Sequence, residues 1–188
     1  MKKIFSILLV FVLLLGVGYT SGAQANTATQ NKIVAAKTKK TNKKQNTMLK
    51  MKLATRSGPG TKFTSTGTFP KATSVKAIEK YKHNGTVWVL VEFKYKKELY
   101  RAYTGEKRFR ISTSKVPTTQ YLNKKAVINT QTDVFYGPGS NYKKYKNPII
   151  ANTEITVVGV ENGFAHIDYS VDKSIRRAYI PESNVIYK

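Results

Sequence analysis

The chain has 188 residues, no cysteine, and a formal net charge of +23 that comes from 33 lysines and arginines against 10 acidic residues. Without cysteine it has no disulfide, no thiolate metal site and no thiol nucleophile. A charge excess of this size predicts a strong attraction to a polyanionic partner.

The N-terminal residues have the pattern of a secretory signal peptide, predicted over residues 1–25. Lys2 and Lys3 precede an apolar run over residues 4–17, and the small-x-small triplet Ala-Gln-Ala follows at residues 23–25. This order predicts export and cleavage, which lowers the formal net charge from +23 to +21. The apolar run is shorter than the about 20 residues of a membrane-spanning helix. We therefore expect no stable membrane anchor, and an uncleaved anchor is the alternative.

Export limits the polyanions that the chain would meet. Around an exported bacterial protein these are teichoic acids, peptidoglycan carboxylates and anionic lipid headgroups. Nucleic acid has equally suitable chemistry, but export argues against it, and we expect no nucleic-acid partner. An exported small protein without cysteine fits a Gram-positive bacterium. The predicted location is secreted and cell-wall associated.

Residues 26–47 are predicted to form a disordered, lysine-rich linker. They consist mainly of Asn, Thr, Ala, Gln and Lys, contain no aromatic residue, and offer little apolar surface to bury. The segment would act either as a flexible spacer or as a contact to an anionic wall, and its composition does not separate the two. The candidates for the wall contact are Lys37, Lys39, Lys40, Lys43 and Lys44.

Two copies of one sequence pattern follow the linker. Four blocks recur in the same order, at offsets between 76 and 80 residues. The paired blocks are residues 56–63 and 135–142, 73–78 and 153–158, 88–93 and 164–169, and 101–103 and 177–179. Short alternating segments separated by turn residues predict a small β-barrel or sandwich rather than helices. The predicted boundaries are residues 48–112 and 126–188 for the two copies, with a linker over residues 113–125.

Each copy has a central strand whose two faces differ. Asn84-Gly85 and Asn162-Gly163 predict a hairpin turn directly before it. One face is predicted to lie in the core, with Val89, Val91 and Phe93 in the first copy and Ala165, Ile167 and Tyr169 in the second. The opposite face carries Trp88, Leu90 and Glu92 in the first copy and Phe164, His166 and Asp168 in the second.

The acidic residues of this opposite face are predicted to form structural pairs. If the next hairpins turn near Lys96 and Asp172, each carboxylate lies across the strand pair from an arginine. The expected pairs are Glu92 with Arg101 and Asp168 with Arg177.

The sequence contains no recognisable catalytic group, and we expect no enzyme. His83 and His166 occupy unrelated positions of the two copies and lack the spacing of a metal site, so no metal or cofactor is predicted. Glu92 and Asp168 are equivalent residues of separate copies and therefore do not flank one glycosidic bond. The two copies and the linkers leave no segment of this chain for a separate catalytic domain.

The repeated blocks resemble the bacterial SH3 family, which occurs in wall hydrolases and other exported proteins of Gram-positive bacteria. The resemblance is carried by Gly-Pro-Gly turns at residues 58–60 and 137–139, each followed by an aromatic residue, and by the closing block Arg-Ala-Tyr-Ile-Pro at residues 177–181. It covers about residues 48–111 and 126–188, and the first copy lacks the closing Ile-Pro turn. The resemblance implies an all-β protein with two small SH3-like barrels in tandem.

The resemblance also implies a module that targets the cell wall, by binding peptidoglycan peptide or an associated polymer such as teichoic acid. Two alternatives remain open: a secreted module that modulates a wall enzyme or a host ligand, and a non-specific polyanion binder. Aromatic residues around the Gly-Pro-Gly turns are the ligand-binding candidates: Phe63, Trp88, Tyr103, Tyr142, Phe164 and Tyr179. For Trp88 and Phe164 the alternative is a structural role in holding the turn.

Overall fold

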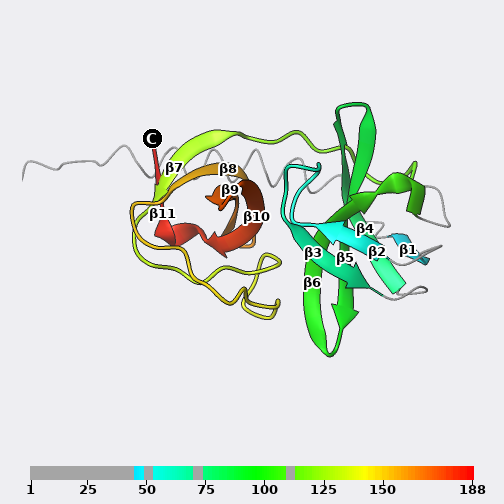
Figure 1. Cartoon of the computed structure of the whole chain (residues 1–188), viewed down its shortest axis with the longest axis horizontal. Coiled ribbons are helices and arrows are strands. Elements are labelled where there is room, and N and C mark those ends of the chain that lie inside the picture. Colours follow the sequence, from blue (N-terminus) through cyan, green and yellow to red (C-terminus); the bar gives the residue numbers. More distant parts are fainter. Residues whose placement is uncertain (1–44, 49–52, 70–73, 109–112) are drawn as a thin grey trace, which may run out of the picture.

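The computed structural model describes residues 45–48, 53–69, 74–108 and 113–188, and these residues form an all-β protein (Figure 1). Two antiparallel sheets contain the strands, one for each copy of the repeat, and we call these copies the first and second modules. The all-β class predicted from the alternating pattern is confirmed. The predicted signal peptide and the five candidate lysines of the N-terminal linker lie outside the described residues.

The first module is a six-stranded sheet with the order β1-β4-β5-β6-β2-β3. Its strands are β1 (Gln45–Met48), β2 (Leu53–Arg56), β3 (Ser65–Phe69), β4 (Ser74–His83), β5 (Thr86–Tyr95) and β6 (Glu98–Gly105), and a 3₁₀ turn, η1 (Glu106–Arg108), follows. β1 begins three residues before the predicted domain boundary, because residues 45–47 pair with β4 instead of continuing the linker. Residues 45–47, which the sequence analysis assigns to the linker, thus belong to a strand.

The second module is a five-stranded sheet with the order β10-β9-β8-β7-β11. Its strands are β7 (Lys124–Ile128), β8 (Glu154–Glu161), β9 (Phe164–Val171), β10 (Ser174–Pro181) and β11 (Val185–Tyr187), with a 3₁₀ turn, η2 (Glu182–Asn184), before the last. Within the described part of the chain, the edge strands of neither sheet pair with each other. The closed barrels that the resemblance implies are therefore not found.

Tight hairpins set the register of the central strands, β5 and β9. All four residues of Asn84-Gly85 and Asn162-Gly163 have positive φ, as type I′ turns require, so both predicted turns are confirmed. The hairpins that follow these strands turn at residues 96–97 and at Asp172, again with positive φ. Glu92 consequently faces Arg101 in the strand register.

Both sheets have a bulge at the same place, which shows that the two copies of the sequence repeat have similar structures. The register of β4 against β5 shifts between Ala77 and Glu79, and that of β8 against β9 shifts between Val157 and Gly159. A bulge adds one residue to a strand and increases its local twist. The two modules thus share an irregular feature as well as their regular strands.

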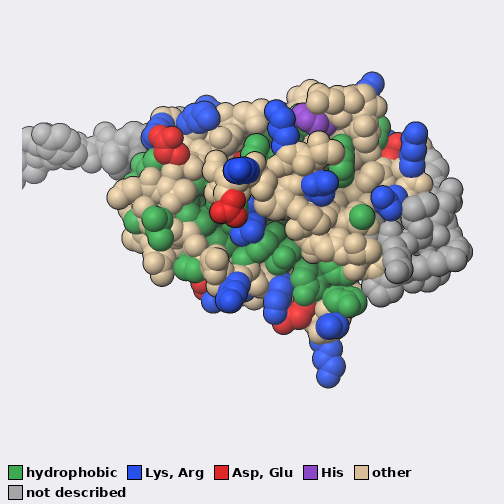
Figure 2. Space-filling view, in the orientation of Figure 1, with side chains coloured by type: hydrophobic (Ala, Val, Ile, Leu, Met, Phe, Trp, Pro, Cys, Tyr) green, Lys and Arg blue, Asp and Glu red, His purple; other side chains and the backbone are tan. Residues whose placement is uncertain are grey.

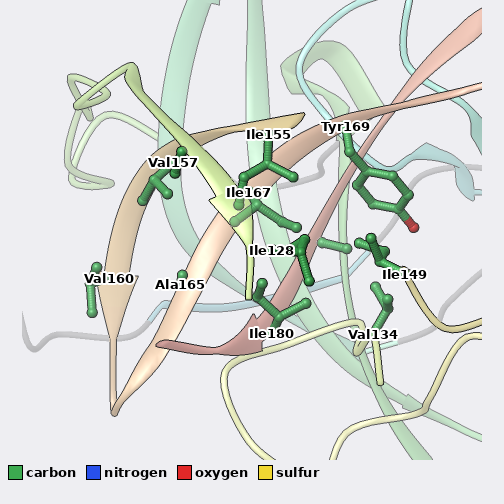
Figure 3. Packing of buried hydrophobic residues seen from close by; sticks show 12 residues of the cluster. Ile128, Val134, Ile149, Ile155, Val157, Val160, Ala165, Ile167, Tyr169 and Ile180 are labelled. Carbon is green, nitrogen blue, oxygen red and sulfur yellow. The ribbon is translucent and has the colours of Figure 1, made fainter. Parts of the chain in front are cut away.

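Each module has its own hydrophobic core, and the predicted core faces of β5 and β9 lie within these cores. In the second module, Ile128, Ile167 and Ile180 are fully buried near its centre (Figure 3). The opposite faces are also covered in part, because Leu90 and His166 are only 3% and 8% exposed.

The segment between the modules packs against the first module along β4. The Lys80 N–H donates to the carbonyl of Pro117 at 2.8 Å, and the Thr119 N–H donates back to the carbonyl of Lys80 at 2.9 Å. Val116 is 5% exposed and belongs to the first core. Residues 113–119 of the connecting segment therefore complete the packing of the first module.

Candidate functional site

Each Gly-Pro-Gly loop packs against the closing strand of the other module. The Thr64 N–H donates to the Ile175 carbonyl on β10 at 2.9 Å, and the Lys143 N–H donates to the Leu99 carbonyl on β6 at 2.9 Å. Both contacts belong to short parallel bridges. The two bridges join equivalent positions of the repeat, so the junction has approximate two-fold symmetry.

A glycine in each loop leaves room for an aromatic ring above the turn. A β-carbon at Gly58 would lie 2.2 Å from the Phe63 ring, and a β-carbon at Gly137 would lie 2.2 Å from the Tyr142 ring. Such distances exclude any side chain at these two positions unless the ring moves. The sequence pattern of Gly-Pro-Gly with a following aromatic therefore places a ring at the junction.

Arg101 of the first module connects both modules through two carboxylates. Its Nε lies 3.0 Å from Glu92, the cross-strand partner predicted from the sequence, and its Nη1 lies 2.6 Å from Glu161 of the second module. The guanidinium carbon also lies 5.5 Å from the centre of the Tyr142 ring. The Tyr142 hydroxyl in turn donates to Glu92.

Arg177 has the equivalent place in the second module and is surrounded by aromatic rings. Its Nε and Nη2 donate to the two carboxylate oxygens of Asp168 at 2.6 and 2.7 Å, so the second predicted pair is also present. The guanidinium lies 4.1 Å from the Tyr121 ring and 5.1 Å from the Phe63 ring. Stacking on rings desolvates a guanidinium while it keeps favourable cation–π contacts.

Four of the six aromatic ligand candidates are built into this junction. Phe63, Tyr103 and Tyr179 are 9%, 0% and 3% exposed. Tyr142 is partly buried and holds the contacts to Arg101 and Glu92 described above. The rings therefore support the packing of the two modules, and a ligand would reach most of them only after the modules separated.

The other two candidates, Trp88 and Phe164, are more accessible. Trp88 is the third residue of β5 and Phe164 is the first of β9, and both are partly buried. Phe164 meets the edge of Phe135 with 5.8 Å between ring centres. Their role in ligand binding stays a prediction.

Sequence reasoning missed a buried polar cluster beside Arg177. Thr119 Oγ donates to Glu79 at 2.6 Å, and the Tyr103 hydroxyl donates to the other oxygen of Glu79 at 3.2 Å. The Tyr121 hydroxyl lies 3.0 Å from that of Tyr103. Thr119 and Tyr121 come from the connecting segment, outside both repeats, so the repeat pattern gave no signal for them.

The two histidines lie apart and have different surroundings. His166 is buried and stacks on Tyr179 with 4.1 Å between ring centres. Burial lowers the pKa of His166 well below its usual value, with Arg177 acting in the same direction, so its ring is neutral at pH 7. His83 is partly exposed at the end of β4. In the part of the chain that the structure describes, no three His, Asp or Glu side chains are grouped as metal ligands.

Lysines dominate the charged part of the described surface. Exposed lysines occur on both modules: Lys62, Lys82, Lys94, Lys96, Lys97, Lys107, Lys115, Lys124, Lys125, Lys144, Lys146, Lys173 and Lys188. Figure 2 shows lysine and arginine side chains spread over one face, with few acidic side chains among them. No helix among the described residues is long and apolar enough to cross a membrane.

No family model matches the chain, and no curated protein matches its sequence.

The junction carboxylates predict a loss of stability in acid. Burial raises the pKa of Glu92, but the hydrogen bond from Tyr142 and the charge of Arg101 outweigh it and lower the pKa from 4.5 to about 2. A carboxylate with a lowered pKa stabilises the fold at pH values above its pKa in the unfolded chain. This contribution to the free energy of unfolding is lost as the pH falls from about 4.5 toward 2. We therefore expect the urea midpoint of the wild type to fall more steeply across this range than that of Glu92→Gln.

The quantity to measure is the difference between the urea midpoints of the wild type and of Glu92→Gln at each pH. Burial raises the pKa of Glu79, and a raised carboxyl pKa changes stability with the opposite sign. This contribution is common to both proteins and cancels in the comparison. Parallel pH profiles would show that Glu92 gains nothing from its partners in the folded state.

Proposed function

We propose that the chain is a secreted, non-catalytic adaptor that binds the cell wall, with two bacterial SH3-like modules that recognise peptidoglycan peptide or an associated anionic polymer. The distribution of charge carries this proposal. Six acidic residues of the described part already form ion pairs with basic side chains: Glu92, Glu98, Asp133, Glu154, Glu161 and Asp168. Most exposed lysines are left to attract an external polyanion.

The junction supports a tandem mode of binding. Backbone hydrogen bonds and the arginine contacts hold the modules in one arrangement, so that lysines of both would face a single polymer at the same time. Simultaneous contacts raise the effective affinity without any new type of interaction. The resemblance to bacterial SH3 modules, together with the signal-peptide pattern, supports the wall as the place where this occurs.

Sedimentation with purified Gram-positive walls, with and without teichoic acid, tests the proposal across a salt series. We compare two variants that lose the same charge, one with the five linker lysines changed to Gln and one with Lys94, Lys96, Lys97, Lys124 and Lys125 changed to Gln. If the modules supply the attraction, the second variant loses about tenfold or more in affinity at low salt, and the first loses less. The reverse order would assign wall binding to the linker.

The same assay separates specific recognition from simple charge attraction. We expect a salt-resistant part of the binding that is lost in Trp88→Ala and Phe164→Ala. Ile150→Ala serves as the matched control, because Ile150 is a large hydrophobic residue that is 66% exposed. Binding that disappears entirely at high salt, and that is unchanged in the aromatic variants, would reduce the protein to a polycation.

A further inference from the structure

A continuous line of side chains crosses from one module to the other outside the arginine junction. The Tyr100 ring on β6 lies 5.1 Å from that of Tyr136, and Tyr136 stacks on Tyr145 at 3.9 Å between ring centres. Arg176 on β10 follows, with its guanidinium carbon 4.8 Å from the centre of the Tyr145 ring. We call these four residues the tyrosine–arginine strip.

The strip is partly buried and partly at the surface. All four side chains are partly exposed. Figure 2 shows hydrophobic side chains gathered in a band across the lower half of the face in view, between the two modules, with lysines and arginines at its border. Tyr100 and Arg176 are also equivalent in the repeat, because they face Phe93 and Tyr169 across their hairpins. The strip therefore begins and ends at matching positions of the two modules.

Arg176 differs from Arg101 and Arg177, the arginines of the two closing blocks. Arg101 and Arg177 each have carboxylate partners, as described above. Arg176 forms no ion pair within the described residues, and its Nε is buried without a hydrogen-bond partner. Among the described residues, its one hydrogen bond to a side chain is a donation to the Tyr169 hydroxyl, which is long at 3.4 Å. The Nη groups of a guanidinium that has no carboxylate partner are suited to an external carboxylate.

We propose that the tyrosine–arginine strip binds a carboxylate-bearing polysaccharide of the cell wall. Tyrosine rings offer a flat apolar surface and a polar tip, which match the apolar face and the hydroxyls of a sugar ring. The guanidinium of Arg176 takes the carboxylate in a two-pronged contact. The inference rests on the proposed wall-binding function and names the ligand of one surface. A polyol phosphate chain lacks the sugar rings that would use the tyrosines.

Binding of the mature protein to three polymers of similar length tests the strip. Polygalacturonate has rings and carboxylates, poly-glutamate has carboxylates alone, and a neutral galactan has rings alone. At physiological salt we expect polygalacturonate to bind most tightly. Arg176→Gln should weaken this binding about ten- to hundredfold, whereas Lys173→Gln, an exposed change of the same charge, should weaken it less than about threefold.

Two further variants separate geometry from charge and from folding. Arg176→Lys keeps the charge but loses the planar fork, so polygalacturonate binding should still fall about tenfold. Tyr100→Leu keeps an apolar side chain against Phe93 and should weaken polygalacturonate binding with no change for poly-glutamate. A urea midpoint within the wild-type range for each variant shows that the fold is kept.

Equal affinity for poly-glutamate and polygalacturonate would overturn the inference, and so would equal losses in Arg176→Gln and Lys173→Gln. Wall sedimentation of the same proteins distinguishes this failure from that of the proposed function. If the wild type binds walls but shows no preference for polygalacturonate, the inference about the strip is wrong and the proposed wall binding is kept. A preference for polygalacturonate that depends on Arg176 supports the strip even if intact walls do not bind.

Discussion

Asp168→Ala is expected to destabilise the protein by about 3–5 kcal/mol, because it leaves a buried guanidinium without its counter-charge. The Arg177 side chain is 4% exposed, and Asp168 supplies its only ion pair within the described residues. Urea unfolding followed by the fluorescence of Trp88, the single tryptophan, measures the change.

Two comparisons show whether the uncompensated charge is the cause. Replacing both partners, with Asp168→Leu and Arg177→Met, should restore much of the lost stability, since apolar side chains need no counter-charge. Glu92→Ala should cost less than Asp168→Ala, because Arg101 keeps Glu161 at 2.6 Å. As a surface control, Glu154→Ala removes an ion pair whose carboxylate is 80% exposed and should cost far less than Asp168→Ala. Similar losses in Asp168→Ala and Glu154→Ala would contradict the argument.

Gly137→Ala is expected to destabilise the protein by about 2–3 kcal/mol through overpacking. The added β-carbon would lie 2.2 Å from the Tyr142 ring, so the ring must leave its place against Arg101. The change therefore strains the turn and loosens the junction between the modules. Urea unfolding gives the loss of stability, and limited proteolysis of the connecting segment reports the loosening.

A matched glycine and a second-site variant make this prediction specific. Gly159 has nothing within 4 Å of its β-carbon position, so Gly159→Ala should change stability by less than about 0.5 kcal/mol. In a Tyr142→Ala background the clash is absent, and Gly137→Ala should then cost much less than in the wild type. An unchanged cost in that background would show that the turn itself, and not the ring, excludes alanine.

Much of each module could be predicted from the sequence because its signals are local. Asn84-Gly85 and Asn162-Gly163 adopt positive φ with little dependence on their surroundings, so the turns follow from the dipeptides alone. Once the turn near Lys96 is known, the two-residue period of a strand places Glu92 opposite Arg101. The same period determined which face of each central strand enters a core.

The boundaries were less predictable, because they depend on pairing. Residues 45–47 have linker-like composition but form part of β1, since β4 offers them backbone partners. Val116 lies in a segment without strand pattern and is buried because the first core leaves room for it. A sheet closes into a barrel only when its two edge strands pair with each other, and the edge strands of the described residues do not.

By itself the sequence determined the charge excess, the repeat, the hairpins and the local acid–base pairs, all of which depend on composition or on neighbours along the chain. Only the tertiary structure decided what the aromatic residues after the Gly-Pro-Gly turns contact. An aromatic at such a turn is equally compatible with an open ligand surface and with a packed junction. The choice is made by contacts such as that of Ser57 with Arg177, 120 positions away, which form only when the modules pack together. The alignment of Tyr100 with Arg176 across the modules arises in the same way.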